Sequence, residues 1–444
     1  MSSELPLLPE GWRYAAVADC CAKNSVTYGV VQPGAALATG KPIVRVNNFR
    51  DTRIDVSDVM YIAPEIEAKY DRTRLKGGEV LLTVVGSVGQ VAVVSPRLSG
   101  FNVARAVAVL HPLPHVQAEW IALCLRSPLS QHLLGSRANT TVQTTINLKD
   151  LRALPVPLPP DGERQLIASF VGPLDDRITL LRETNATLEA IAQALFKSWF
   201  VDFDPVRAKM EGRPPEGMDE ATAALFPDGF EESELGLVPT GWRAATLADA
   251  FEINPKRALK KAAIAPYLDM ASLATSGHCV QPPISRTAGS GAKFSNGDTL
   301  LARITPCLEN GKTAFVDFLE PGEVGWGSTE FIVLRAKASW PDYMGYLLCR
   351  HPAFRDYAIQ SMSGTSGRQR VQNEVLARYP LVLSGDEIAR AFGEILDSVQ
   401  CRIAANHAMA QTLSTLRDTL LPRLISGQLR LPDIEHALKE SLNV

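Results

Sequence analysis

The sequence predicts a mixed α/β protein in which two α/β domains are separated by two long helices that pair as a coiled coil. Three observations predict this fold class: a repeat along the whole chain, short β-branched segments in each copy, and a heptad pattern after each set of segments. The chain has 444 residues, of which 46% are hydrophobic, so two or three domains can each bury a core.

The repeat begins with LPEGWRYAAVADC at residues 8–20, which corresponds to VPTGWRAATLADA at 238–250. Three more pairs follow in the same order: GGEVLLTVVGSVGQVAVV (77–94) with NGDTLLARITPCLENGKTAFV (296–316), LCLRSP (123–128) with LLCRHP (347–352), and LRALPVPLP (151–159) with LARYPLVLS (376–384). This agreement predicts two copies of a unit of about 225 residues, a period too long for a solenoid.

Each copy begins with a predicted α/β domain, residues 1–158 in the first copy and 237–383 in the second. Short runs such as VLLTVV, VAVV and FIVLRA have the composition of strands and are bounded by Gly, Pro and Asn turns. The segment AEWIALCLRS is typical of a short helix between strands. The pattern leaves the strand order open.

A long helix is predicted after each domain, within residues 159–212 and 384–444, with a linker at 213–236. Apolar residues recur at alternating steps of four and three over about five heptads, which is typical of a coiled coil. Pro214 and Pro215 should end the first helix. The predicted seam includes Leu174, Ile178, Leu181, Asn185, Leu188, Leu195, Val399, Ile403, Asn406, Leu413, Leu420 and Leu424.

Two seam positions are polar, Asn185 and Asn406. An asparagine inside a seam fixes register and partner orientation at a cost in stability. The alternative is that both residues sit at an edge of the coiled coil and face water.

Charge alternates along the chain, although the net charge is only −3. Each predicted α/β domain carries 16 Lys and Arg against 12 Asp and Glu, whereas residues 159–236 carry 7 against 16 and residues 384–444 carry 6 against 8. Two mildly basic blocks suggest a polyanionic partner without proving one. With no signal peptide and no apolar run of about 18 residues, we expect a cytoplasmic protein that makes no membrane contact. The seven cysteines include no Cys-x-x-Cys pair, which predicts reduced, mostly buried thiols.

Familiar catalytic motifs are missing from the sequence. There is no phosphate-binding loop, no dinucleotide-binding turn and no nucleophile elbow. GSVG at 86–89 lies between two strand patterns, which favours a tight turn, and His111 and His115 flank Pro114 in a predicted loop. We therefore expect no catalytic residue, no metal site and no cofactor in this chain.

Polar, Gly-rich loops recur at corresponding places in the two basic domains. Arg, Asn, Gln and Lys can read base edges, and Ser and Thr can position phosphates, although any one such loop is more often a solvated turn. The candidate DNA-binding residues are Arg45, Asn47, Asn48, Arg50, Ser87, Gln90, Arg137, Asn139, Thr140, Thr141 and Gln143 in the first copy, and Arg286, Arg303, Thr305, Lys312, Ser366, Arg368, Gln369 and Arg370 in the second.

The chain resembles the specificity subunits of type I restriction–modification enzymes over essentially its whole length. The resemblance rests on the Pro-x-Gly-Trp-Arg openings, on LPVPLPPDGERQLI at the first helix entry, and on ALFKSWFVDFDPVRAK at its end. The second helix entry, with Ser-Gly-Asp-Glu-Ile-Ala-Arg at 384–390, departs from the family's Pro-Pro-x-x-Glu-x-Gln pattern. The predicted partner-binding residues are Phe196, Trp199, Phe200, Phe203, Asp204 and Arg207.

The resemblance implies two target-recognition domains, each reading half of a split double-stranded DNA site, and two antiparallel helices that act as a spacer and dock two methyltransferase subunits. S-adenosylmethionine would bind the methyltransferase, and restriction subunits are possible further partners. Because the two sets of loops differ, we expect an asymmetric target. We also expect that lengthening the helix at 181–188 would change the gap and keep both half-sites.

Two other functions remain as alternatives. The chain can be a scaffold that binds proteins through two domains on a coiled-coil strut, with no DNA involved. The Asp202–Asp204 pair can act in hydrolysis, although its place beside four aromatic residues at a helix end favours packing or capping.

Overall fold

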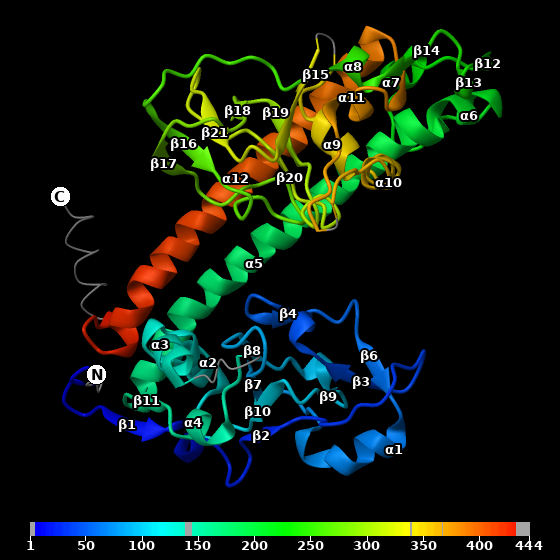
Figure 1. Ribbon diagram of the computed structural model, residues 1–444. Coiled ribbons are helices and arrows are strands. Elements are labelled where there is room, and N and C mark those ends of the chain that lie inside the picture. The colour runs from blue at the N-terminus through cyan, green and yellow to red at the C-terminus, as the bar shows by residue number, and fades with distance from the viewer. Residues whose placement is uncertain (1–4, 138–143, 338–339, 366, 432–444) are drawn as a thin grey trace. The chain divides into compact units, whose positions relative to one another are not determined.

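A computed structural model of the chain describes residues 5–137, 144–337, 340–365 and 367–431 (Figure 1). The chain divides into two compact units: unit 1 comprises Met1–Leu180 with Ala410–Val444, and unit 2 comprises Leu181–Met409. Both divisions fall inside the long helices α5 (Asp161–Lys197) and α12 (Asp386–Ile425). Each unit therefore holds one α/β domain and one part of each long helix.

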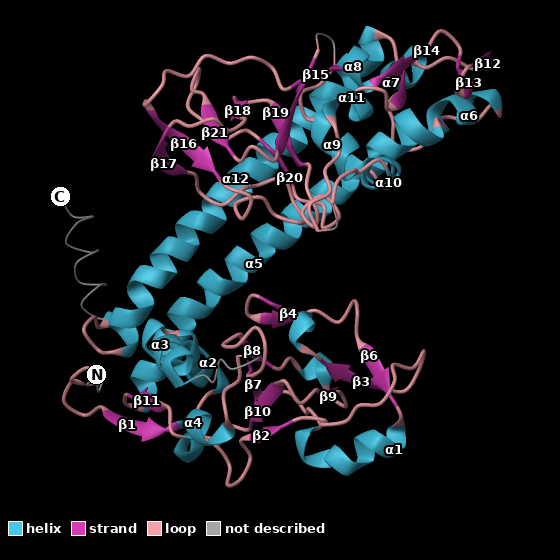
Figure 2. Cartoon of the chain, viewed as in Figure 1, coloured by secondary structure: helices cyan, strands magenta, loops and turns pink. Residues whose placement is uncertain are grey.

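The α/β domain of unit 1 consists of short elements connected by turns, as Figure 2 shows. Its helices are α1 (Pro64–Glu67), α2 (Ala118–Arg126), α3 (Pro128–Arg137) and α4 (Leu148–Arg152). Its strands are β1 (Arg13–Ala16), β2 (Thr27–Tyr28), β3 (Lys41–Val44), β4 (Phe49–Arg50), β5 (Arg53–Ile54), β6 (Met60–Ile62), β7 (Val80–Thr83), β8 (Val91–Val93), β9 (Asn102–Val103), β10 (Val107–Leu110) and β11 (Pro155–Leu158).

Unit 2 contains the corresponding elements and a connecting segment before them. Its shorter helices are α6 (Asp204–Met210), α7 (Glu220–Leu225), α8 (Leu247–Ala250), α9 (Met344–Arg350), α10 (Pro352–Gln360) and α11 (Asn373–Leu376). Its strands are β12 (Phe230–Ser233), β13 (Gly236–Pro239), β14 (Arg243–Thr246), β15 (Phe251–Ile253), β16 (Ile264–Leu268), β17 (Ile284–Thr287), β18 (Lys293–Phe294), β19 (Asp298–Ala302), β20 (Thr313–Phe315), β21 (Gly325–Gly327), β22 (Phe331–Ala336) and β23 (Pro380–Leu383).

The sequence repeat corresponds to a repeat of topology. The four-stranded sheet of unit 1 has the order β2-β10-β7-β8, and that of unit 2 has the matching order β15-β22-β19-β20. Each unit also has a second sheet, β6-β3-β9 or β17-β16-β21-β18, in which one pair, β3–β9 or β16–β21, is parallel. The sequence predicted the duplication and the fold class, and the strand order comes from the structure.

The central strands are apolar on both faces because both faces are covered. Leu81 of β7 belongs to one buried cluster, whereas its neighbours Val80 and Leu82 belong to another that includes α2. Successive side chains of a strand point to opposite faces, so a strand buried on both sides has a continuous apolar sequence. This explains the run VLLTVV.

The repeated Gly-Trp-Arg opening leads into the strand that joins the two ends of each domain. Gly11 and Gly241 have φ values of 82° and 79°, a conformation that suits glycine, and each begins a turn into a strand. That strand, β1 or β14, pairs antiparallel with the last strand of its domain, β11 or β23. The two ends of each domain are thus tied together immediately before a long helix begins.

The long helices pack antiparallel in each unit. The early part of α5 shares a core with the late part of α12 in unit 1, and the late part of α5 shares one with the early part of α12 in unit 2. Every residue of the predicted seam is buried or half-buried. In unit 2, Asn185 Nδ2 donates to the carbonyl of Ile403 at 3.0 Å, and Asn406 Nδ2 donates to Asn185 Oδ1 at 2.9 Å. The two asparagines therefore face each other between the helices.

The end of the first helix differs from the expectation that it runs to Pro214. The α-helix ends at Lys197, a π-helical turn covers Ser198–Asp202, and Phe203 adopts a left-handed conformation with φ 58° before α6 begins. The break is caused by aromatic packing, because the wider turn directs Trp199, Phe200 and Phe203 into the core of unit 2.

Candidate nucleic-acid interface

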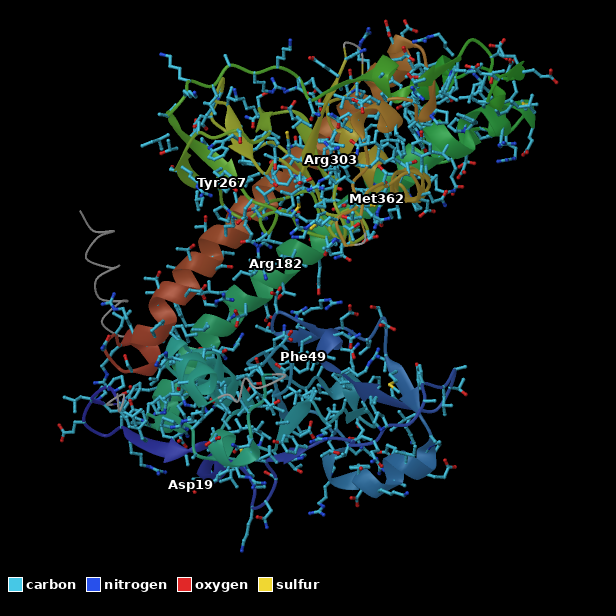
Figure 3. The ribbon with its side chains drawn as sticks, in the orientation of Figure 1. Asp19, Phe49, Arg182, Tyr267, Arg303 and Met362 are labelled. Carbon is cyan, nitrogen blue, oxygen red and sulfur yellow. The ribbon has the colours of Figure 1, made fainter. Side chains whose placement is uncertain are left out.

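Unit 2 has a cavity of about 560 Å³ whose lining carries four cationic side chains. Lys256 and Arg257 come from the segment after β15, Lys293 from β18, and Arg303 from the segment after β19. Asn254, Ser290, Gly291 and Thr329 add polar groups to the same lining. Arg303 is labelled in Figure 3 among the side chains of this unit.

The cations of this cavity differ in how far their charge is already balanced. Arg257 donates to both oxygens of Asp298 at 2.5 and 2.6 Å, and Arg335 donates to the same carboxylate at 2.8 Å. Lys293 instead donates to the carbonyl of Arg257 at 3.3 Å, and Arg303 to the amide oxygen of Gln372 at 3.0 Å. Over the described ranges, neither Lys293 nor Arg303 forms an ion pair, so both retain charge for an anion.

The carboxyl of Asp298 is fully buried, and burial raises its pKa above the ordinary value despite the opposing effects of the Ser295 amide, Arg335 and Arg257. Two guanidinium groups share this one carboxylate. Because Arg335 also pairs with Asp342 at 3.2 Å, these two guanidinium groups face two carboxylates, and the cationic character of the cavity comes from Lys256, Lys293 and Arg303.

A close backbone approach fixes one wall of the cavity. A Cβ at Gly291 would lie 1.6 Å from the carbonyl oxygen of Gly327, so only glycine allows this loop to lie against β21. Asn254, also in the lining, has φ 53° and accepts a hydrogen bond from the Val333 amide at 2.9 Å. The cavity is thus shaped by backbone contacts as well as by side chains.

The loops that the sequence indicated meet in pairs, in the same way in both units. In unit 1, Val85 and Thr145 form a β-bridge, so the turn at 86–90 lies beside the segment after α3. In unit 2, Ile304 and Arg370 form the corresponding bridge, and the Thr305 amide donates to the carbonyl of Gln369 at 3.0 Å. GSVG is a turn between β7 and β8, as its flanking strand patterns predicted.

Among the candidates in unit 2, the structure brings Arg303, Thr305, Gln369 and Arg370 together. Arg370 is already committed, since its guanidinium makes three hydrogen bonds of 2.7 to 3.1 Å to the carboxylate of Glu330. These bonds lower the pKa of Glu330 below its ordinary value. Arg370 thus anchors its loop to the sheet and is a weaker candidate for base contact than the sequence suggested.

Arg368 belongs to the same loop as Gln369 and Arg370, whereas Lys312 and Arg286 are engaged elsewhere in unit 2. Arg368 is exposed. Lys312 donates to the carbonyl of Met270 at 2.6 Å, which ties it to its own domain. Arg286 is exposed on β17, with its guanidinium carbon 4.8 Å from the ring centre of Tyr267.

In unit 1, the candidates near β4 divide into buried and exposed residues. Asn48 is buried and donates to the carbonyls of Asp55 and Asp58 at 3.0 and 2.9 Å, so it supports the loop and cannot reach DNA. Arg45 is half-buried beside Asp58. Asn47 and Arg50 are exposed.

Ser87, Gln90 and Arg137 are the remaining described candidates of unit 1. Ser87 is exposed, and Gln90 is half-buried with a side-chain oxygen that has no hydrogen-bond partner among the described residues. Arg137 donates to the carbonyl of Asp150 at 3.4 Å. Five candidates lie outside the described residues: Asn139, Thr140, Thr141, Gln143 and Ser366.

Sequence reasoning missed Lys256, Arg257 and Lys293. The signal was present, because the run NPKRALKK at 254–261 is dense in cations and Lys293 ends the Gly-rich run RTAGSGAK at 286–293. The prediction rests on loops that recur in both copies, and NPKRALKK has no basic counterpart at the start of the first domain.

The four predicted partner-binding aromatic residues are buried by the chain itself. Phe196, Trp199, Phe200 and Phe203 are at most 9% exposed and pack in unit 2 with Trp242, Phe226 and Phe392. They cannot form a docking surface without unfolding, which corrects that part of the expectation. Asp204 and Arg207 are exposed, and they line a cavity of about 440 Å³.

The chain shows neither a metal site nor a membrane span among its described residues. Within the described part of the chain, no group of three or more His, Cys, Asp or Glu residues is placed to hold a metal ion. No described helix is long and apolar enough to span a membrane. Of the seven free cysteines, four are buried: Cys20, Cys21, Cys124 and Cys349.

The duplicated α/β domains and the antiparallel helices define the class of protein: a chain of two repeated domains on a helix pair, with a cationic cavity in unit 2. Residues 27–190 match the family model described as the type I restriction modification DNA specificity domain. The HindI specificity subunit of Haemophilus influenzae is 24% identical over 80% of this chain and 87% of that subunit, and the MjaIX subunit of Methanocaldococcus jannaschii is 22% identical over 80% and 79%. The EcoBI specificity subunit of Escherichia coli is 29% identical over 42% of each chain.

A solved S subunit from M. genitalium has the same fold, with a TM-score of 0.52 at 15% identity, covering 95% of this chain and 99% of that one. The chain belongs to the family of type I restriction–modification specificity subunits. It is the non-catalytic component, the one that recognises the DNA target.

Proposed function

We propose that this chain reads an asymmetric, bipartite double-stranded DNA target, one half-site with each α/β domain, and positions two adenine-N6 methyltransferase subunits on it. The observation that carries the proposal is that the two units share one strand order and present different side chains at their paired loops. Two domains with the same strand order and different loop residues favour the recognition of two different half-sites.

Charge supports a role for unit 2 in gripping the DNA backbone. Lys293 and Arg303 line an open cavity without ion-pair partners among the described residues, which suits contact with phosphate. The exposed Arg368 lies in the loop that pairs with the segment of Arg303 and is available for base edges. In unit 1, Asn47 and Ser87 are the exposed counterparts, and the exposed Arg50 lies 3.7 Å from the carboxylate of Asp55.

The start of α6, which follows the π-helical turn after α5, is the proposed contact with the methyltransferase. Asp204 and Arg207 are exposed beside a cavity that also includes Glu211 and Arg213. The aromatic residues behind them hold this surface rigid. The methyltransferase would supply the S-adenosylmethionine site and flip the target adenine out of the duplex. Restriction subunits are further proposed partners.

Mapping methylated adenines across the genome, with and without the gene, tests the proposal directly. We expect a motif with two unlike halves and a fixed gap to disappear when the gene is removed. A palindromic motif, or no change in methylation, would refute the asymmetric target.

The rival function, a protein scaffold, predicts a different salt response. Gel shifts of the chain assembled with its methyltransferase should show target preference and an affinity that falls steeply as salt rises. A scaffold would show neither property.

The proposed hydrolytic role of Asp202 and Asp204 is less favoured by the geometry. Asp202 forms an ion pair with Lys197, and Asp204 lies in the first turn of α6, where a negative charge is stabilising. The double variant Asp202→Asn/Asp204→Asn should keep any DNA chemistry of an assembled complex. Loss of that chemistry with assembly intact would restore the catalytic alternative.

A further inference from the structure

Each α/β domain is connected to α5 through an arginine at the same position of the repeat. Arg126 is the last residue of α2 and Arg350 is the last residue of α9, and they occupy the fourth position of LCLRSP and LLCRHP. Both helices pack against the four-stranded sheet of their domain. The two arginines are therefore rigidly attached to equivalent points of the two domains.

In unit 1, the connection joins three elements through one carboxylate. Arg126 Nη1 donates to Asp175 Oδ2 of α5 at 2.7 Å, and Arg417 Nη1 of α12 donates to Asp175 Oδ1 at 2.8 Å. Asp175 is only 8% exposed. A paired charge with so little access to water is geometrically demanding, because a small displacement leaves a charged group unpaired.

In unit 2, Arg350 reaches the same helix but a different carboxylate. The residue that corresponds to Asp175 in the second copy is Gln400, which has no charge and instead donates to Asp317 at 2.6 Å. Arg350 lies 3.6 Å from Glu189 of α5, and the Tyr346 hydroxyl donates to the same carboxylate. The arginine therefore has the same place in both repeats, but its carboxylate partner does not. The repeat would place that partner at Gln400 of α12, and the structure has it at Glu189 of α5.

Both arginines are also fixed on the domain side. Arg126 Nε donates to the carbonyl of Ala122 at 3.3 Å. Arg350 Nη1 donates to the carbonyls of Gly311 and Thr275 at 2.7 and 2.8 Å. Each arginine side chain therefore contacts both α5 and its own domain. The planar geometry of its donors couples the orientation of the domain to that of the helix.

We propose that Arg126 and Arg350 are positioning residues that set the angle of each recognition domain on the helix pair, and that they thereby fix the gap between half-sites. This inference rests on the proposed bipartite function. It assigns gap selectivity to two side chains that need not contact DNA, and it leaves half-site selectivity to the loops.

The test compares methylation motifs in cells that express the full chain with its methyltransferase. In the wild type we expect one gap. In Arg126→Gln, methylation at gaps one base pair longer or shorter should rise by roughly tenfold relative to the native gap, because a domain that is no longer preorganised samples more angles. The sequence of both half-sites should not change. Arg72→Gln, at an exposed position of the same domain, should behave as the wild type.

A milder pair of variants separates positioning from folding. Arg126→Lys and Arg350→Lys keep the charge and lose the planar double donor, so they should show a smaller relaxation of the gap with normal half-sites. If Arg126→Gln and Arg126→Lys both lose methylation at every gap, Arg126 acts only in folding and the assignment is overturned. An unchanged single gap in Arg126→Gln, Arg126→Lys and Arg350→Lys overturns it as well. If the wild type itself has no fixed gap, the proposed function fails instead.

Discussion

At the scale of single residues, ion pairing decides which cations of unit 2 are free to meet a DNA backbone. Arg257 and Arg370 are committed to Asp298 and Glu330. Lys293 makes a longer bond to a backbone carbonyl. Breaking an internal ion pair to bind phosphate costs free energy, so a cation without a carboxylate partner is the better phosphate ligand.

Lys293→Ala should therefore weaken DNA binding about equally for all sequences. Loss of one phosphate contact lowers the slope of log affinity against log salt by about 1. Titrations of the assembled complex at several salt concentrations measure this slope. Arg378→Ala, at an exposed position of the same unit, is the control. An unchanged slope together with altered base preference would assign Lys293 to base reading instead.

The Glu330–Arg370 pair gives a prediction about pH. Hydrogen bonds from Arg370 lower the pKa of Glu330 below its ordinary value of 4.5, so its ionised form stabilises the folded state. The contribution is complete above pH 4.5 and is lost as pH falls through the lowered pKa. Glu330→Gln should lower Tm at pH 7, and the difference from wild type should shrink below pH 4.5.

Thermal melting of both proteins between pH 7 and pH 3 tests this prediction. Glu309→Gln, which changes an exposed carboxylate of the same domain, should leave Tm nearly unchanged across that range. A Tm difference that grows as pH falls would mean that the sign of the linkage is wrong.

The residue types in the sequence predicted a polar, cationic interface, but they identified only some of the residues that form it. Arg303 was found from its loop, whereas Lys256 and Lys293 share the same cavity and were missed. The cavity joins the segment after β15, strand β18 with the loop before it, and the segment after β19. These are far apart in sequence, so their meeting depends on a strand order that periodicity does not contain. Asn48 shows the converse error, because a polar residue in a turn can equally well satisfy its own backbone.

At the scale of elements, the two long helices were the most predictable part of the fold. A heptad pattern specifies which side chains are buried without reference to any distant segment, and the seam residues are accordingly buried or half-buried. The end of α5 was not predictable from Pro214. Its position is set by the aromatic core of unit 2, where Phe200 packs on Phe392 and Trp242.

The asparagine pair of the helices yields a prediction about stability. Asn406→Leu removes the donor to Asn185 Oδ1 and should destabilise unit 2 by about 1 kcal/mol, because a half-buried acceptor loses its partner. In Asn185→Leu/Asn406→Leu no polar group is left unpaired, so Tm should recover to the wild-type value or above it. Calorimetry of the single and double variants gives the order. A double variant less stable than the single one would contradict the role of this hydrogen bond.

At the scale of the whole molecule, duplication with divergence explains why one chain contains both constancy and variation. The strand order recurs in both units. So do the strand pair that follows the Gly-Trp-Arg opening and the arginine that ends α2 or α9. The loop residues and the carboxylate partners do not. Such a chain can change what each domain reads while the frame that carries the domains stays the same.

The frame can be tested by changing its length. Because α5 packs antiparallel on α12, an insertion must enter both helices to keep the seam in register, within 181–188 of α5 and beside Ile403 and Asn406 of α12, which face Asn185. Seven residues in each helix add about 10.5 Å at 1.5 Å per residue, which corresponds to about three base pairs at 3.4 Å each. The methylation motif should keep both halves and gain a longer gap. The same insertion in α5 alone should abolish methylation, since it displaces Asn185 from Asn406. If the double insertion leaves the gap unchanged, the helices do not set the distance between the half-sites.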